Sequence, residues 1–149
     1  MQPKFSIADL KQRLREHHCK MTPQRREVLE VFLNNEGEHL NAEKIYKELK
    51  EHKESDIGLA TIYRTLELMC DIDILRRLEL FDDGCAFYEL NMSEPNAHQH
   101  HHLICKKCHK VIEFSDDLLE SLESSISKQC GFKIVDHQLK FFGYCQECQ

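Results

Sequence analysis

The chain has 149 residues, of which 41% are hydrophobic and 31% are charged. This balance is that of a folded globular protein with one or two small domains, and it excludes the disordered and fibrous classes. The sequence contains no run of about 18 apolar residues and no apolar segment near its N-terminus, so it predicts neither a membrane span nor a secretory signal. We therefore expect a cytoplasmic protein.

Positive charge is concentrated at the N-terminus, although the formal net charge of the chain is −6. Residues 1–26 carry seven lysines and arginines but only two acidic residues. A DNA-binding face needs positive charge only locally, so a negative net charge of the whole chain does not exclude DNA binding. A solvated basic helix has the same composition, so charge alone does not decide between the two.

Four short helices are predicted before residue 72. Thr22 and Asn41 are the expected N-caps of the second and third helices, because their side chains can accept hydrogen bonds from the first turn. The fourth helix follows Gly58, and we expect Thr65 on its outer side. The apolar residues recur at the helical spacing that gives each helix one buried face. These residues are Ile7, Leu10, Leu14, Val28, Leu29, Phe32, Leu33, Ala42, Ile45, Tyr46, Leu49, Leu59, Ile62, Leu66 and Met69.

A β-hairpin is predicted after the helices. Two strand-like runs, residues 75–81 and 85–90, are joined by Asp-Asp-Gly, and Asp-Gly between such runs favours a tight turn. Three helices followed by a hairpin are typical of a winged helix-turn-helix, with the first helix as an N-terminal addition. We predict this domain over residues 1–91 and a hinge over residues 92–97.

Residues 98–149 predict a smaller domain of strands and one helix. The runs 101–105 and 110–114 are expected strands. A helix capped by Ser115 should continue to about Gln129 and stop at Gly131. Alternating side chains over residues 132–145 predict a final strand.

Two CxxC pairs, at Cys105 and Cys108 and at Cys145 and Cys148, have the spacing of a four-thiolate zinc site. Such a site would support a domain that has little core of its own. A redox CxxC or disulfides are the alternatives, but two coupled pairs in a reducing compartment favour zinc. The remaining cysteines are expected to be mostly small packed residues; they are Cys19, Cys70, Cys85 and Cys130.

Four histidines crowd into residues 98–102. On a strand, His100 and His102 would share one face and His101 would lie on the other, so they could serve two different sites. A mixed imidazole–carboxylate set suits Fe(II), Mn(II), Zn(II) or Co(II). A solvated polar strand is the simpler alternative. We expect His137 on an apolar strand face, where a buried core residue is the simpler alternative to a metal ligand. The candidate oxygen ligands are Glu89, Glu113, Asp116, Asp117 and Glu120.

Taken together, several segments resemble the ferric uptake regulator (Fur) family of metalloregulators over essentially the whole chain. They are Lys20–Arg25, His39–Tyr46, Gly58–Leu66, Phe87–Leu90, the HxHHHLICxxC run that ends at Cys108, Lys110–Phe114, and Asp136-His137 with the final CxxC. The resemblance implies an α+β fold with an N-terminal winged helix-turn-helix DNA-binding domain. It also implies a small C-terminal α/β dimerisation domain with a four-cysteine zinc site, over residues 98–149.

The resemblance further implies three metal sites. The structural zinc falls on the four cysteines of the CxxC pairs. The regulatory metal falls on His39, Glu89, His100, His102 and Glu113, and an additional metal falls on His101, Glu120 and His137. Gln99 stands where many relatives carry another histidine. One regulatory ion bound across the hinge would fix the dimer in its operator-binding conformation.

For DNA, the resemblance implies a recognition helix over residues 58–70 that enters the major groove of a palindromic, A/T-rich operator. Tyr63 would contact thymine methyl groups and Arg64 a phosphate or guanine, whereas packing in the core is the alternative for Tyr63. Lys20 would approach an A/T-rich minor groove, and Arg25 a phosphate. The implied DNA-binding residues are Lys20, Arg25, Thr61, Tyr63 and Arg64.

Glu89 favours iron as the sensed metal, since zinc-sensing relatives tend to have cysteine and peroxide-sensing relatives aspartate at this position. The resemblance therefore implies a homodimeric or larger Fe(II)-responsive repressor of iron uptake genes, not an enzyme. Its cofactors would be structural Zn²⁺ and a regulatory Fe²⁺ that Mn²⁺, Zn²⁺ or Co²⁺ could replace. Zinc, manganese and peroxide sensing stay open within the family. Outside it, the alternatives are a metal buffer, which leaves the winged-helix pattern unexplained, and a zinc enzyme, whose HExxH and deaminase signatures are missing.

Overall fold

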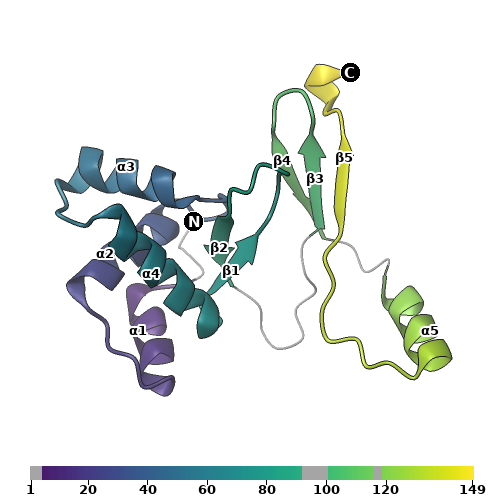
Figure 1. Cartoon of the computed structure of the whole chain (residues 1–149), viewed down its shortest axis with the longest axis horizontal. Coiled ribbons are helices and arrows are strands. Elements are labelled where there is room, and N and C mark those ends of the chain that lie inside the picture. Colours follow the sequence, from purple (N-terminus) through teal and green to yellow (C-terminus); the bar gives the residue numbers. More distant parts are fainter. Residues whose placement is uncertain (1–4, 92–100, 116–118) are drawn as a thin grey trace. The chain divides into compact units, whose positions relative to one another are not determined.

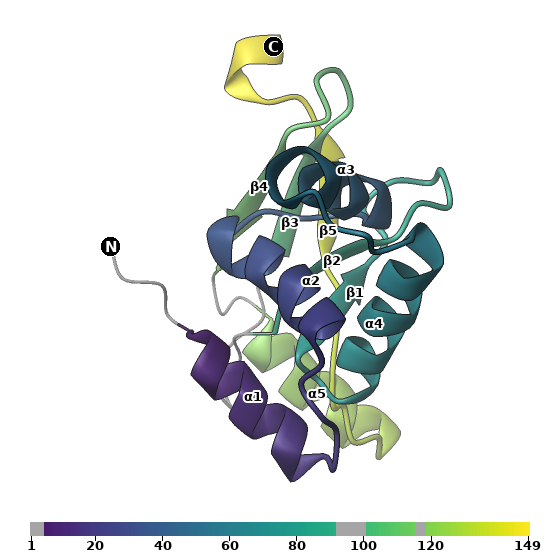
Figure 2. The ribbon, with the colours of Figure 1, turned by 90° about the vertical axis from the view of Figure 1, so that its left-hand side faces the viewer.

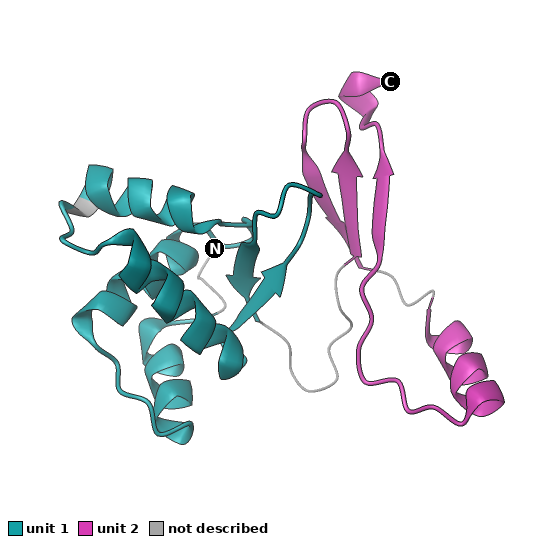
Figure 3. Ribbon diagram, in the orientation of Figure 1, with its two compact units in different colours: residues 1–92 teal, residues 93–149 magenta. Residues whose placement is uncertain are grey.

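The structure of the protein is a computed structural model that describes residues 5–91, 101–115 and 119–149 (Figure 1). The chain divides into two compact units, residues 1–92 and residues 93–149 (Figure 3). The hinge predicted over residues 92–97 lies outside the described residues and stays a prediction. None of the helices in the described ranges has the length and hydropathy needed to cross a membrane.

The first unit contains the four predicted helices, each starting at a defined cap. Thr22 caps the second helix by accepting from the backbone N–H of Arg25, and Asn41 caps the third in the same way, as predicted. Ser6 and Asp9 form a reciprocal capping box on the first helix, which the sequence analysis did not identify. The helices are α1 (Ile7–Glu16), α2 (Pro23–Asn34), α3 (Ala42–Lys53) and α4 (Leu59–Asp71).

The core of this unit lies among α2, α3 and α4, which pack against one another (Figure 2). Leu10 and Leu14 of α1 are buried in the same core, so α1 is an integral part of the domain. The prediction for Thr65 is wrong, because this residue is buried at 5% exposure. Its position three residues after Ile62 and four before Met69 places it on the inward face of α4.

The predicted hairpin is present, with shorter strands. β1 (Leu75–Leu78) pairs antiparallel with β2 (Phe87–Leu90), and residues 79–86 form the connection. Gly84 adopts a φ of 75° in this connection, where a glycine is favoured. Leu40 adds an antiparallel bridge to Tyr88, with backbone hydrogen bonds of 3.0 and 2.7 Å, and thereby fixes the segment before α3 against β2.

The second unit is a three-stranded sheet with one helix, α5 (Glu120–Cys130), and a short 3₁₀ helix, η1 (Gln146–Cys148). The central strand β3 lies between the antiparallel β4 and the parallel β5 (Figure 1). No residue of α5 is buried in this described segment. The strands are β3 (His101–Cys105), β4 (Val111–Phe114) and β5 (Lys140–Gly143).

Two boundaries in this unit were predicted wrongly. α5 is preceded by Leu119 as its N-cap residue, without a side-chain cap, instead of starting at Ser115; Asp116 and Asp117 lie outside the described residues. The last strand covers only residues 140–143, because ladder pairing with β3 starts at Lys140. Gly131 ends α5 in the left-handed conformation, as predicted.

Replacing Leu14 with alanine should destabilise the first unit, because its side chain is fully buried. Leu→Ala changes at such positions cost about 2–5 kcal/mol of unfolding free energy. Urea unfolding followed by circular dichroism measures the loss, with Lys11→Ala on the exposed side of α1 as the matched control. A loss below about 1 kcal/mol for Leu14→Ala would show that α1 does not contribute to the core.

Candidate metal centres and DNA interface

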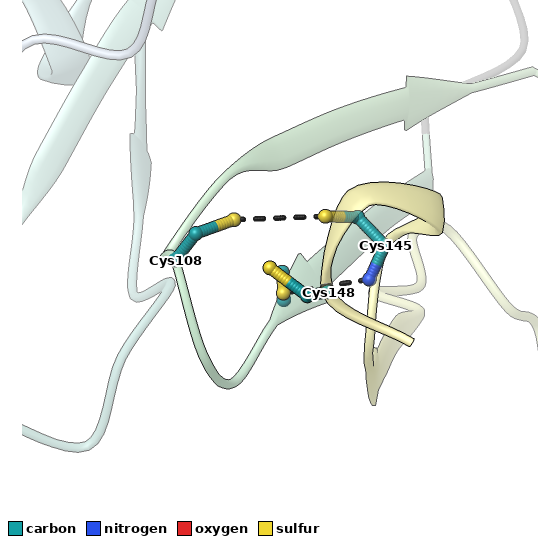
Figure 4. A group of neighbouring side chains, drawn as sticks. Cys108, Cys145 and Cys148 are labelled. Carbon is teal, nitrogen blue, oxygen red and sulfur yellow. Dashed lines mark hydrogen bonds between the residues drawn. The ribbon is translucent and has the colours of Figure 1, made fainter.

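Four cysteine sulfurs converge in the second unit (Figure 4). The Sγ atoms of Cys105, Cys108, Cys145 and Cys148 all lie within 4.8 Å of one another. The Sγ atoms of Cys108 and Cys145 are 3.6 Å apart. A tetrahedral zinc with Zn–S bonds of about 2.3 Å requires S···S distances of about 3.8 Å. The four thiols therefore fit a structural zinc site, as the CxxC spacing predicts.

Local hydrogen bonds give thiols of this cluster different pKa values. Backbone N–H groups, first that of Cys108 and then that of Cys145, lower the pKa of Cys105 to about 6. The hydrogen bond to Cys145 and the burial of the thiol raise the pKa of Cys148 to about 12. These contacts thus favour the thiolate form of Cys105 and the protonated form of Cys148. Zinc must displace such protons to bind four thiolates, so its affinity for this site should rise with pH.

The first unit holds an imidazole beside a carboxylate. His39 Nε2 lies 3.2 Å from Glu89 Oε2, and only 9% and 15% of the two side chains are exposed. The Leu40–Tyr88 bridge explains the contact, because it sets the residues next to each of its partners side by side. This pair belongs to the predicted regulatory set and could supply two ligands to a divalent cation.

The second unit holds a corresponding pair on its sheet. His102 on β3 is the register partner of Glu113 on β4, and His102 is buried at 5% exposure. Both residues belong to the predicted regulatory set. His100, the fifth member, lies outside the described residues.

His101 and His137 of the additional predicted site lie close together. Their ring centroids are 5.4 Å apart. His137 does not lie on a strand, as had been predicted, but in the segment between α5 and β5. Its Nδ1 forms a hydrogen bond with Glu123 Oε1, whereas the predicted ligand Glu120 lies at the first position of α5. Glu123 was missed, although it follows Glu120 by three residues and thus shares its side of the helix.

The outer side of α4 presents the residues predicted to contact DNA. Tyr63 is 39% exposed and Arg64 is also exposed, which excludes the core alternative for Tyr63, whereas Thr61 is partly buried. The Tyr63 hydroxyl donates to Glu43 Oε1 of α3 at 3.0 Å, and this hydrogen bond raises the pKa of Tyr63. No local signal in the sequence marks Glu43, since its partner lies on another helix.

The two basic residues predicted to contact DNA near α2 are linked to each other. Arg25 Nη1 donates to the backbone carbonyl of Lys20 at 2.7 Å, while the Lys20 side chain is exposed. The backbone N–H of Arg25 is held by the Thr22 cap. The Arg25 guanidinium at the start of α2 is therefore held against the backbone of Lys20.

The cysteines outside the cluster differ in their surroundings. Cys19, Cys70 and Cys85 are partly buried, in line with the prediction that most are packed residues, whereas Cys130 is exposed. Burial is the main cause that raises the pKa of Cys70 to about 11. This thiol is therefore protonated and unreactive at neutral pH.

Comparison with known proteins decides the family. The ferric uptake regulator family model matches residues 16–142. The chain belongs to the ferric uptake regulator family. Members of this family are metal-responsive, DNA-binding transcriptional repressors that act as dimers, and this chain is such a repressor.

Individual relatives agree with the family match. The chain is 45% identical to the ferric uptake regulation protein of Bacillus subtilis (strain 168) over 142 residues, which cover 95% of this chain and 93% of that one. The iron-containing ferric uptake regulator of Francisella tularensis aligns with a TM-score of 0.75 and 34% identity, over 87% of this chain and 93% of that chain. The Helicobacter pylori regulator, described as having three functional metal binding sites, aligns with a TM-score of 0.77 and 27% identity, over 99% and 97% of the two chains.

Replacing Cys108 with serine should remove the structural zinc from this Fur-family protein. The bound zinc should fall by about one equivalent per chain, and the second unit should lose its folded structure because a thiolate ligand is missing. Zinc analysis combined with hydrogen exchange of β3–β5 measures both effects. Cys130→Ser, which changes an exposed thiol outside the cluster, is the matched control. Unchanged zinc content and exchange protection in Cys108→Ser would refute the zinc assignment.

Proposed function

We propose that this Fur-family repressor responds to Fe(II) and controls iron uptake genes in the cytoplasm. The observation that carries the proposal is the largely buried His39–Glu89 pair, an imidazole–carboxylate set with no thiol. Nitrogen and oxygen ligands of this kind suit Fe(II) and Mn(II), whereas soft thiolates favour zinc. The similarity to proteins named ferric uptake regulation protein supports iron as the signal.

We assign the regulatory metal to His39, Glu89, His100, His102 and Glu113. The first two belong to the first unit and the other three to the second. One ion bound by all five would favour a single arrangement of the two units. The ion can favour the arrangement that binds DNA only to the extent that it binds this arrangement more tightly than the others. The shift in the equilibrium between arrangements equals this difference in binding free energy. The additional metal is assigned to His101, Glu120 and His137, and the three metal sites of the Helicobacter pylori relative support this assignment.

We assign operator binding to the outer side of α4 and the start of α2. Tyr63 and Arg64 would read base edges in the major groove, with Thr61 beside them. Lys20 and Arg25 would bind the backbone and a narrow minor groove. A symmetric dimer of such units fits a palindromic, A/T-rich operator.

We further propose that the second unit forms the dimer. It exposes several large apolar side chains that a second copy would cover. They are Ile112, Leu122, Ile126, Phe132, Phe141, Phe142 and Tyr144. Assembly beyond the dimer stays a prediction.

Replacing His39 or His100 with alanine should abolish Fe(II)-dependent operator binding while the fold and the structural zinc remain. Each change removes one ligand of the proposed regulatory set. His39 belongs to the first unit of the chain and His100 to the second. Anaerobic fluorescence anisotropy with a labelled operator measures Kd with and without Fe(II). His52→Ala, on an exposed position of α3, is the control. Fe(II) activation that survives in both variants would contradict the regulatory assignment.

Replacing Tyr63 with alanine should weaken operator binding by about tenfold in Kd, within the roughly 1–3 kcal/mol of a base contact. Fe(II) affinity should not change, because Tyr63 is not in the proposed metal set. The free energy of unfolding should fall by no more than about 1.5 kcal/mol, the contribution of the lost hydrogen bond to Glu43. Tyr46→Ala removes a similarly exposed tyrosine from α3 and serves as the control. Equal Kd values for Tyr63→Ala and Tyr46→Ala would exclude a specific contact by Tyr63.

A further inference from the structure

We propose that Glu123 is a positioning residue for a divalent cation bound by His101 and His137. Glu123 would hold the His137 ring through Nδ1 and leave Nε2 as the metal-binding atom. The inference rests on the additional metal site proposed above and assigns a role to a residue outside its predicted ligand set.

The contact between Glu123 and His137 determines which ring nitrogen is available. The Glu123 carboxylate lies at hydrogen-bond distance from His137 Nδ1. A carboxylate can only accept, so Nδ1 carries the proton and donates it. In the neutral imidazole, Nε2 then bears a lone pair.

Two imidazole nitrogens are left buried and without a hydrogen-bond partner among the described residues. They are Nε2 of His137 and Nδ1 of His101. His101 is 3% exposed and its ring also lies against Phe114, with centroids 5.6 Å apart. A buried nitrogen without a partner is costly in free energy, so two of them on adjacent rings require an explanation.

A cation provides that explanation. Histidine ligands of metals commonly donate their second ring N–H to a carboxylate, which fixes the tautomer and raises the basicity of the ligating nitrogen. The Glu123–His137 contact has this form. Glu120, one turn earlier on α5, is the proposed oxygen ligand, so the site would combine two nitrogens with a carboxylate. Such a set suits a borderline divalent cation such as Zn²⁺ or Co²⁺.

A simple ion pair between Glu123 and a protonated His137 does not account for the same observations. Protonated histidine carries an N–H on both nitrogens. Its Nε2–H would then be a buried donor with no acceptor among the described residues. The neutral tautomer with a metal-binding Nε2 leaves no donor unsatisfied.

The test uses the full-length protein with its structural zinc retained and with His39→Ala, which removes a ligand of the regulatory site. Co(II) affinity is measured by competition with a calibrated chelator for Glu123→Ala, His101→Ala and His137→Ala. Glu67→Ala, which removes a carboxylate from an exposed position on α4, is the control. The ¹⁵N shifts of the His137 ring report its tautomer in the same proteins before Co(II) is added.

We expect His101→Ala and His137→Ala to lose one Co(II) site. We expect Glu123→Ala to weaken this site by about 10- to 100-fold and to shift His137 away from the Nδ1–H tautomer, because the acceptor for Nδ1–H is removed. An unchanged affinity and tautomer in Glu123→Ala, with the site lost in His137→Ala, would refute the positioning role while leaving the additional metal site intact. Unchanged Co(II) binding in both histidine variants would refute the additional site itself, and this inference with it.

Discussion

The convergence of four cysteine thiols is the interaction on which the second unit depends. The unit is a small sheet with a helix that buries no residue in its described part, so apolar packing within one chain contributes little to its stability. The cluster joins the turn between β3 and β4 to the last residues of the chain. β3 also carries His101 and His102, so a zinc ion at its end would indirectly position both proposed exchangeable metal sites.

In the first unit, the winged-helix fold itself brings two of the proposed metal ligands together. The bridge between Leu40 and Tyr88 ties the segment before α3 to the hairpin, and His39 and Glu89 are the neighbours of these two residues. α3 then leads into α4, whose outer side presents Tyr63 and Arg64. Two of the proposed metal ligands and the proposed DNA contacts of α4 are thus attached to one core.

Much of this arrangement could be predicted from the sequence, because local signals determine it. Caps such as Thr22 and Asn41, the apolar spacing of the helices and the CxxC pairs all act over a few residues. The error in the length of the last strand occurred where long-range pairing decides. Residues 132–138 alternate like a strand, but in the described part of the chain the ladder with β3 starts only at Lys140. α5 also starts later than Ser115 suggests. Glu43 and Glu123 were missed for the same reason, since their partners lie on other segments of the chain.

The central claim, that Fe(II) in a thiol-free site switches on operator binding, is tested most directly by an anaerobic operator titration. The protein would keep its structural zinc, and Fe(II), Mn(II) and Zn(II) would each be supplied at buffered free concentrations. The account predicts that Fe(II) at cellular concentrations tightens operator binding and that this persists after mild peroxide treatment. Activation by Zn(II) alone, or loss of operator binding after trace peroxide, would contradict iron sensing and assign a different signal to the same fold.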